Sequence, residues 1–187
     1  MKEHIVVVGA SHAGVAFLDA MRTHGFTGNL TIIDRLPDWP MERPPLSKAF
    51  LYDDSGPETY FLRKPEWYEQ NNITMRKGQE VTAIDRAGQN VTLHSGEVIS
   101  YDKLVLATGA RARMLPDARG VAGVHVVRDP LDALAIKDAI GRSESARSDS
   151  ARSESARPES TKAIVIGGGY IGLETTASLR KMGLSVA

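Results

Sequence analysis

Residues 2–34, KEHIVVVGASHAGVAFLDAMRTHGFTGNLTIID, contain the pattern that decides the fold. An apolar, β-branched run over residues 5–8 predicts a buried strand. A glycine-rich turn follows over 9–14 and leads into a helical pattern in which Val15, Leu18 and Met21 are three residues apart. A second apolar run, 30–33, ends at Asp34. Strand, tight turn, helix, strand and acid in this order are the layout of a dinucleotide-binding βαβ unit.

The residues of the glycine-rich turn suggest how a dinucleotide would be held. Gly9 permits the sharp turn, Gly14 lets the helix pack close to the strand, and the helix N-terminus offers N–H groups to a pyrophosphate. Ser11 stands where the fingerprint has its second glycine, so we expect weakened binding rather than loss. Asp34 lies twenty residues after Gly14, where an acid can hydrogen-bond a ribose. The alternative is a generic βα turn; a nucleophile elbow is excluded because the third glycine comes one position too late.

The composition limits the class of protein. A chain of 187 residues with 42% hydrophobic and 25% charged residues is typical of a soluble globular protein of one or two domains. The 23 basic residues balance 23 acidic ones, so we expect neither nucleic acid nor a membrane as partner. Without an apolar run of about 20 residues or a signal-peptide pattern, a cytoplasmic location is expected. The absence of cysteine excludes disulfides and cysteine redox centres in these residues, and the histidines are not spaced as metal ligands.

The middle of the chain contains a loop, a small sheet and a further strand. Residues 35–48 carry four prolines, so they form either a rigid surface loop or a loop that directs Arg43 and Lys48 at an anion. Residues 80–85, 90–94 and 98–101 alternate apolar and polar, which predicts an antiparallel meander. Residues 104–110, LVLATGA, predict a buried strand that either simply ends or brings its Thr-Gly backbone close to a ligand. A strand over 121–127 and a helix over 130–140, stopped by Gly141, are expected next.

The composition changes at residue 142. Residues 142–160 repeat Arg-Ser-acid-Ser-Ala and contain no large apolar residue, which predicts a disordered, charge-balanced linker. A phosphorylated tract that binds RNA is disfavoured because the alternating charges cancel the basic field. After it, a strand over 163–166, the complete fingerprint GGGYIG at 167–172, a helix over 173–182 and a strand from 184 predict a second dinucleotide-binding unit.

Three motifs between and within these units point to a family. They are ERPPLSK at 42–48, LVLATGAR at 104–111 and GGGYIGLE at 167–174. The chain resembles the flavoproteins with two dinucleotide-binding domains, and within them the ferredoxin/rubredoxin/putidaredoxin reductase family. The lack of cysteine separates it from disulfide reductases, coenzyme A disulfide reductases and NADH oxidases.

The resemblance implies an α/β, Rossmann-like FAD/NAD(P)-binding fold with an inserted antiparallel β meander and a truncated second dinucleotide-binding unit. Members of the family are much longer, so we expect the chain to correspond to their N-terminal half. The expected domains are the first part of an FAD-binding domain (1–115), a crossover strand and helix (116–141), the linker (142–160) and the start of an NAD(P)H-binding domain (161–187).

The implied function is an FAD-dependent oxidoreductase that passes electrons from NAD(P)H through flavin to a ferredoxin- or rubredoxin-type protein of an oxygenase system. Lys48 is the candidate for a positive charge near the flavin, and no catalytic acid or base is required. The alternatives are an inactive dinucleotide-binding fragment, a nitrite reductase subunit and an apoptosis-inducing-factor-like flavoprotein. Self-association through truncated surfaces is also expected.

The resemblance also implies the cofactor-binding residues. Those for FAD are Gly9, Ser11, His12, Ala13, Gly14, Asp34, Arg35, Arg43, Lys48, Val81, Ala107, Thr108, Gly109 and Arg128. Those for NAD(P)H are Gly167, Gly169, Tyr170, Ile171, Gly172 and Glu174. The family usually has glycine and then an acid where this chain has Asp34 and Arg35, so the acid is shifted by one position. The residue that would distinguish NADH from NADPH falls beyond Ala187.

Overall fold

The computed structural model describes residues 2–150 and 161–187, which contain both helices and strands. The strands are β1 (His4–Val8), β2 (Asn29–Ile33), β3 (Ile73–Arg76), β4 (Val81–Asp85), β5 (Asn90–Leu93), β6 (Val98–Ser100), β7 (Lys103–Leu106), β8 (Lys162–Ala163) and β9 (Ser185–Val186). The α-helices are α1 (His12–Thr23), α2 (Ala49–Tyr52), α3 (Pro65–Gln70), α4 (Pro130–Ser150) and α5 (Tyr170–Lys181). Short 3₁₀ turns are η1 (Pro44–Ser47), η2 (Pro57–Tyr60) and η3 (Pro116–Ala118).

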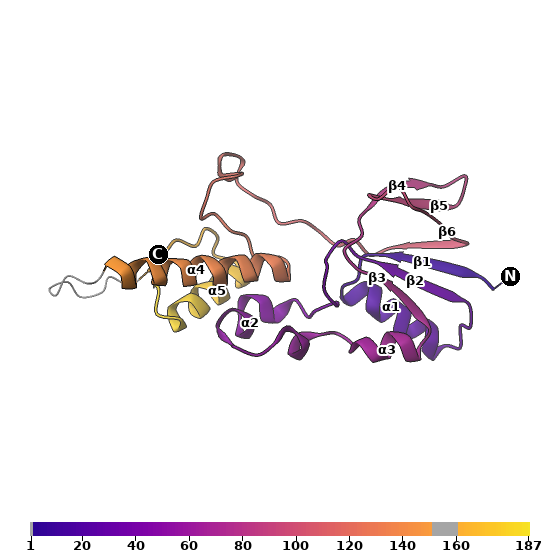
Figure 1. The fold of residues 1–187 in the computed structure, drawn as a ribbon, viewed down its shortest axis with the longest axis horizontal. Coiled ribbons are helices and arrows are strands. Elements are labelled where there is room, and N and C mark those ends of the chain that lie inside the picture. The colour runs from indigo at the N-terminus through magenta and orange to yellow at the C-terminus, as the bar shows by residue number, and fades with distance from the viewer. Residues whose placement is uncertain (1, 151–160) are drawn as a thin grey trace. The chain divides into compact units, whose positions relative to one another are not determined.

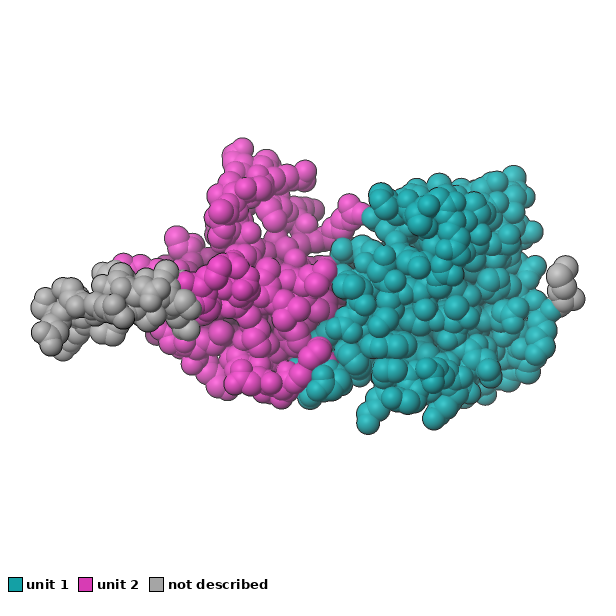
Figure 2. Space-filling model, viewed as in Figure 1, with its two compact units in different colours: residues 1–42, 58–110 teal, residues 43–57, 111–187 magenta. Residues whose placement is uncertain are grey.

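The chain divides into two compact units, coloured separately in Figure 2. Unit 1 contains Met1–Glu42 and Glu58–Ala110, and unit 2 contains Arg43–Pro57 and Arg111–Ala187. Each glycine fingerprint therefore lies in a different unit. The domain boundaries expected at 115, 141 and 160 stay a prediction.

Unit 1 is built on a parallel sheet of order β3-β2-β1-β7. Side chains alternate between the faces of a strand, and both faces of β1 are covered. Ile5 and Val7 pack with Leu18 of α1 and Tyr68 of α3 in one core cluster. On the other face Val6 packs in a second cluster beneath the meander. Figure 1 shows the meander on one side of the sheet and α1 and α3 on the other.

The meander explains why the first strand is apolar without interruption. Strands β4, β5 and β6 pair antiparallel, and Val91 and Leu93 of β5 are 0% and 2% exposed against the sheet. A strand covered on both faces needs apolar residues at every position rather than at alternate ones. The Rossmann-like fold with an inserted meander is confirmed.

Arg22, near the end of α1, joins two loops of unit 1 by hydrogen bonds. Its guanidinium donates to the carbonyl oxygens of Phe26 and Gly28, in the loop after α1, at 2.6 and 3.0 Å. It also donates to the carbonyls of Asn71 and Asn72, after α3, at 2.7 and 2.9 Å. The planar guanidinium suits such a divergent set of acceptors because its donors lie in a fixed fork.

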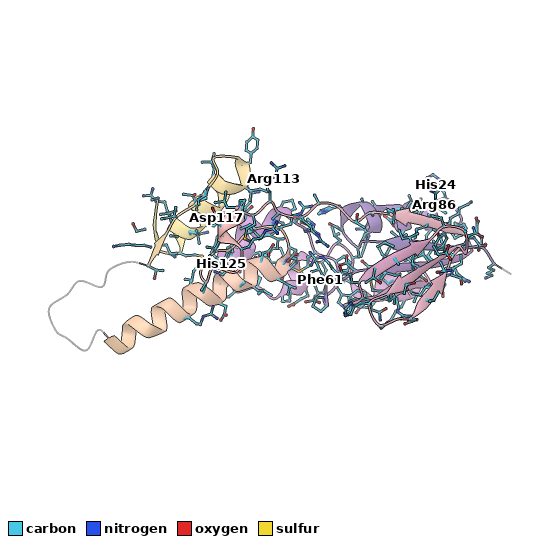
Figure 3. The ribbon with its side chains drawn as sticks, turned by 90° about the horizontal axis from the view of Figure 1, so that it is seen from above. His24, Phe61, Arg86, Arg113, Asp117 and His125 are labelled. Carbon is cyan, nitrogen blue, oxygen red and sulfur yellow. The ribbon has the colours of Figure 1, made fainter. Side chains whose placement is uncertain are left out.

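Replacing Arg22 by methionine is expected to lower the free energy of unfolding by about 2–3 kcal/mol. A hydrogen bond to a charged group contributes about 1.5–3 kcal/mol, and the total loss is limited because some of the freed carbonyl groups bind water instead. Chemical denaturation followed by circular dichroism measures the change. The matched control is Arg86→Met, because Arg86 is exposed in the β4–β5 turn (Figure 3). Equal stability of the two variants would contradict the assignment.

Unit 2 buries one side of α4 and of α5. Ala133, Ile136 and Ile140 of α4 are buried, as are Leu179 of α5 and Leu51 of α2. Within this unit α2 lies against both α4 and α5. Strands β8 and β9 form a short parallel pair.

Two expectations about unit 2 are wrong. Helix α4 does not stop at Gly141 but continues to Ser150, because a glycine in a helix interior costs only about 1 kcal/mol. The first part of the repeat is therefore helical, and residues 151–160 of the expected linker lie outside the described residues. The strand expected over 121–127 is absent from the structure, since Gly120 and Gly123 have φ of +75° and +80°, which break an extended chain. His125 lies in this segment, and Arg113 and Asp117 precede it in the chain (Figure 3).

Candidate dinucleotide-binding sites

The first glycine-rich loop lies between β1 and α1 in unit 1. Gly9 has φ +102°, and a Cβ there would lie 2.4 Å from the carbonyl oxygen of Ala107. A Cβ on Gly14 would lie 2.1 Å from the carbonyl oxygen of Gly9. Both positions therefore require glycine. Gly9 lies against the chain that follows β7, and Gly14 lies where α1 crosses the loop closely.

The loop ends at a helix N-terminus. Ser11 is the N-cap of α1 with extended backbone, φ −122°, so serine fits this position without backbone strain. The N–H groups of His12, Ala13 and Gly14 belong to the first turn, where an α-helix supplies no acceptor. These amides and the positive end of the helix dipole suit an anion such as a pyrophosphate.

The second loop, between β8 and α5 in unit 2, repeats this geometry. Gly167 has φ +123°, and a Cβ on Gly172 would lie 2.0 Å from the carbonyl oxygen of Gly167. Gly169 is the N-cap of α5, with Tyr170 as the first helical residue. A Cβ on Gly168 or Gly169 would meet no atom within 4 Å, so this loop faces open space. The two loops thus share a left-handed first glycine and a later glycine that lies close to the carbonyl oxygen of the first.

A polar cluster in unit 2 joins η1 to α5. Lys48 Nζ lies 2.9 Å from Glu174 Oε1, and Ser47 Oγ donates to Glu174 Oε2 at 2.7 Å. Ser178 Oγ donates to the carbonyl oxygen of Ser47 at 2.7 Å. The cluster therefore brings the ends of the ERPPLSK and GGGYIGLE motifs together.

Comparison with known proteins agrees with these two loops. Residues 3–187 match the family described as pyridine nucleotide-disulphide oxidoreductase. The chain belongs to this family.

Its relatives are reductases. The chain is 39% identical to rhodocoxin reductase of Rhodococcus erythropolis over 183 residues, which cover 97% of this chain and 39% of the relative. It is 37% identical to putidaredoxin reductase of Pseudomonas putida, with 98% and 40% covered. The crystal structure of the covalent putidaredoxin reductase–putidaredoxin complex matches with a TM-score of 0.82 and 36% identity, over 98% of this chain and 41% of that one. The chain thus spans about 40% of the length of the curated relatives that it matches.

Lys48 and Glu174 were expected at different cofactors, and the structure pairs them. Sequence reasoning missed Ser47 and Ser178 altogether, although Ser47 stands inside the ERPPLSK motif. The hydrogen bond from Ser47, followed by the hydrogen bond and the charge of Lys48, lowers the pKa of Glu174 below its ordinary value of 4.5. Glu174 is therefore held as a carboxylate, and it fixes the position of the Lys48 ammonium.

This pKa shift makes a pH-dependent prediction. A carboxyl group whose folded pKa is depressed stabilises the fold above its unfolded pKa, and the contribution is lost as the pH falls through the folded value. Glu174→Gln should therefore melt below the wild-type chain at neutral pH, and the difference should disappear as the pH falls well below 4.5. Thermal melts across this range, with Glu58→Gln in η2 as the control, test it. A constant difference at all pH values would contradict the predicted ionic contribution.

Arg43 and Arg128, both expected at FAD, are also joined. Arg43 Nη1 donates to the carbonyl oxygen of Arg128 at 2.5 Å. Residue 128 is fixed in turn by its N–H, which donates to Asp132 Oδ2 at 2.9 Å, and Asp129 and Asp132 exchange hydrogen bonds at the start of α4. This reciprocal pair is a capping box, which sets where the helix begins.

The remaining residues expected at FAD lie at the strand ends of unit 1. The N–H of Ala107 donates to the carbonyl of Val8 at 2.8 Å, and Thr108 and Gly109 follow as exposed backbone. Val81 begins β4 and is half-buried against the second core cluster. Their contacts with a cofactor stay a prediction.

Asp34 and Arg35 follow β2. Both carboxylate oxygens of Asp34 accept backbone hydrogen bonds, Oδ2 from Ala10 at 2.5 Å and Oδ1 from Leu36 at 2.8 Å. Arg35 is exposed. Neither residue's contact with a ribose is tested by the structure.

No group of three or more histidine, cysteine or acidic residues in 2–150 and 161–187 is arranged to hold a metal ion. In the same residues, the helices lack the combination of length and apolar character that a membrane crossing requires.

Proposed function

We propose that this chain binds FAD at the first glycine-rich loop and NAD(P)H at the second, as part of a reductase that passes electrons to a ferredoxin- or rubredoxin-type protein of an oxygenase system. The observation that carries the proposal is the duplicated loop. Each loop has a left-handed glycine at its start and a later glycine where a Cβ would come within about 2 Å of that first glycine's carbonyl oxygen. Two such loops in one chain suit two dinucleotides.

The names of the relatives support a small redox protein as the electron acceptor. Rhodocoxin reductase, putidaredoxin reductase and rubredoxin-NAD(+) reductase are named for their electron partners, and one relative belongs to a benzene 1,2-dioxygenase system. The solved complex of putidaredoxin reductase with putidaredoxin supports a small redox protein as the partner of this chain also. A cytoplasmic location remains part of the proposal.

The residues of the chain would bind and orient rather than react. In unit 1 the first-turn amides of His12, Ala13 and Gly14 would hold the FAD pyrophosphate. In unit 2 the amides of Tyr170, Ile171 and Gly172 would hold that of NAD(P)H. A bound flavin would supply the chemistry, namely hydride transfer from a reduced nicotinamide and the release of single electrons.

Lys48 remains our candidate for the positive charge that the resemblance places near the flavin. Its ammonium is held by Glu174, which limits the orientations that the long side chain samples. The ion pair is half exposed, so we assign it a positioning role rather than a large contribution to stability.

A second candidate is a dinucleotide-binding chain without reductase activity of its own. Ile164 and Ile166, which follow β8, are 79% and 77% exposed, and Leu173 of α5 is 62% exposed. Apolar side chains this exposed on neighbouring elements favour coverage by a further polypeptide. This candidate includes the expected self-association.

Anaerobic titration of the FAD-loaded chain with NADH separates the two candidates. Bleaching of the visible flavin band, followed by reoxidation when an oxidised ferredoxin is added, is the result expected of a reductase. Flavin that stays bound and oxidised in the presence of NADH would exclude the reductase activity and leave the second candidate.

A further inference from the structure

We propose that Asp34 is a positioning residue that fastens the first glycine-rich loop before any cofactor binds, rather than a reader of the ribose. This inference rests on the proposed FAD site and assigns a role within it. Its basis is the placement of the carboxylate, which spans from the loop after β1 to the loop after β2. Oδ2 accepts the N–H of Ala10, inside the glycine-rich loop, and Oδ1 accepts that of Leu36.

The backbone of Asp34 holds the side chain in this place. Its N–H donates to the carbonyl oxygen of Arg76 at 2.9 Å, and its own carbonyl oxygen accepts the N–H of Gln79 at 2.8 Å. Residue 34 is thus hydrogen-bonded to the glycine-rich loop after β1, to the end of β3 and to the loop after β3. The carboxylate cannot swing to a ligand without releasing the Ala10 amide, and Ala10 is only 5% exposed, so water would not readily replace the lost acceptor.

The backbone N–H groups of the loop therefore fall into two groups, one bonded within the protein and one available to a ligand. The Ala10 N–H is used internally, where it bonds an ionised acceptor and is therefore strongly held. The amides of the first turn of α1, from His12 onward, remain for an anion. Asp34 fixes the path of the chain between them and so sets the direction in which those amides point.

Hydrogen exchange of the chain without cofactor tests this directly. Asp34→Ala should speed exchange of the Ala10 amide at least tenfold, as expected when a hydrogen bond to a charged acceptor is lost. Asp34→Asn, which keeps the shape of the side chain and one acceptor, should give an intermediate change. The control is Asp38→Ala, because Asp38 lies on the same loop and accepts a hydrogen bond from the adjacent N–H of Trp39, at 2.7 Å. Unchanged exchange at Ala10 in both Asp34 variants would overturn the proposal.

A second experiment separates positioning from ribose recognition. The affinities of the wild-type chain and of Asp34→Asn are measured for ADP and for 2′,3′-dideoxy-ADP. A positioning residue weakens both ligands by the same factor, so the ratio of the two affinities stays at its wild-type value. If the substitution weakens ADP alone, Asp34 reads the ribose hydroxyls and the proposal is wrong. If neither FAD nor ADP binds the wild-type chain, the proposed function fails, and the exchange experiment alone decides the role of Asp34.

Discussion

Replacement of Gly14 by alanine is expected to abolish FAD binding and to lower the free energy of unfolding by about 3 kcal/mol. The added Cβ would lie 2.1 Å from the carbonyl oxygen of Gly9 and 3.2 Å from Ile32 Cδ1. The first contact is with backbone, so α1 must move away from β1, and the helix N-terminus moves with it. Because 1.4 kcal/mol corresponds to a tenfold change, we expect FAD affinity to fall about 100-fold or more.

Flavin fluorescence titration and chemical denaturation measure the two effects. The matched control is Gly141→Ala in α4, where a Cβ meets no atom within 4 Å and alanine favours the helix by about 0.5–1 kcal/mol. This control should bind FAD as the wild-type chain does and be slightly more stable. A Gly14→Ala variant with wild-type affinity would show that α1 does not need its close crossing of the loop.

The second large effect is expected at Gly172. Alanine there would place a Cβ 2.0 Å from the carbonyl oxygen of Gly167, so the start of α5 must shift. Because Gly172 and Gly14 lie in different compact units, NADH binding should fall about 100-fold while FAD binding changes little. The opposite selectivity of Gly14→Ala and Gly172→Ala is the signature of two separate dinucleotide sites.

NADH fluorescence titration and FAD titration of the same preparation test this selectivity. Gly168→Ala serves as the control for stability, because a Cβ at 168 meets no atom within 4 Å. It should melt with the wild-type chain, whereas Gly172→Ala should melt earlier. Equal loss of both ligands in Gly172→Ala would mean that the variant damages the whole chain and not one site.

The parts of the fold that the sequence predicts well are those encoded by short-range periodicity. The run Ile5–Val8 is apolar at every position, which indicates a strand covered on both faces, and the structure covers it with helices on one side and the meander on the other. The meander strands were predicted from the alternation of apolar and polar residues, and the structure contains them as β4, β5 and β6. Both fingerprints are also local patterns, so both loops and their helices could be located.

The parts that could not be predicted depend on context beyond the local pattern. Gly141 was predicted to end the helix, yet α4 continues through it to Ser150. The apolar residues from Val121 to Val127 looked like a strand, but the left-handed Gly120 and Gly123 turn the chain there. The pairing of Lys48 with Glu174 joins motifs 126 positions apart, and no local signal assigns them to one another.

Asp34 shows that the role of a residue can be harder to predict from sequence than its position. Its position after β2 predicts an acid that hydrogen-bonds a ribose, and that contact stays a prediction. What it does there depends on the direction of its side chain, and the structure directs it to the backbone of Ala10 and Leu36. Residue spacing alone does not distinguish an acid that binds a ligand from one that shapes the loop around it.

The central claim is that the loop from Gly9 to Gly14 is an FAD-binding site, and equilibrium titration of the purified chain with FAD tests it most directly. We predict saturable quenching of flavin fluorescence with one FAD per chain, lost in Gly14→Ala and retained in Gly141→Ala. A folded, monomeric chain that leaves flavin fluorescence unchanged at every concentration, or that binds equally well with alanine at position 14, would contradict the claim.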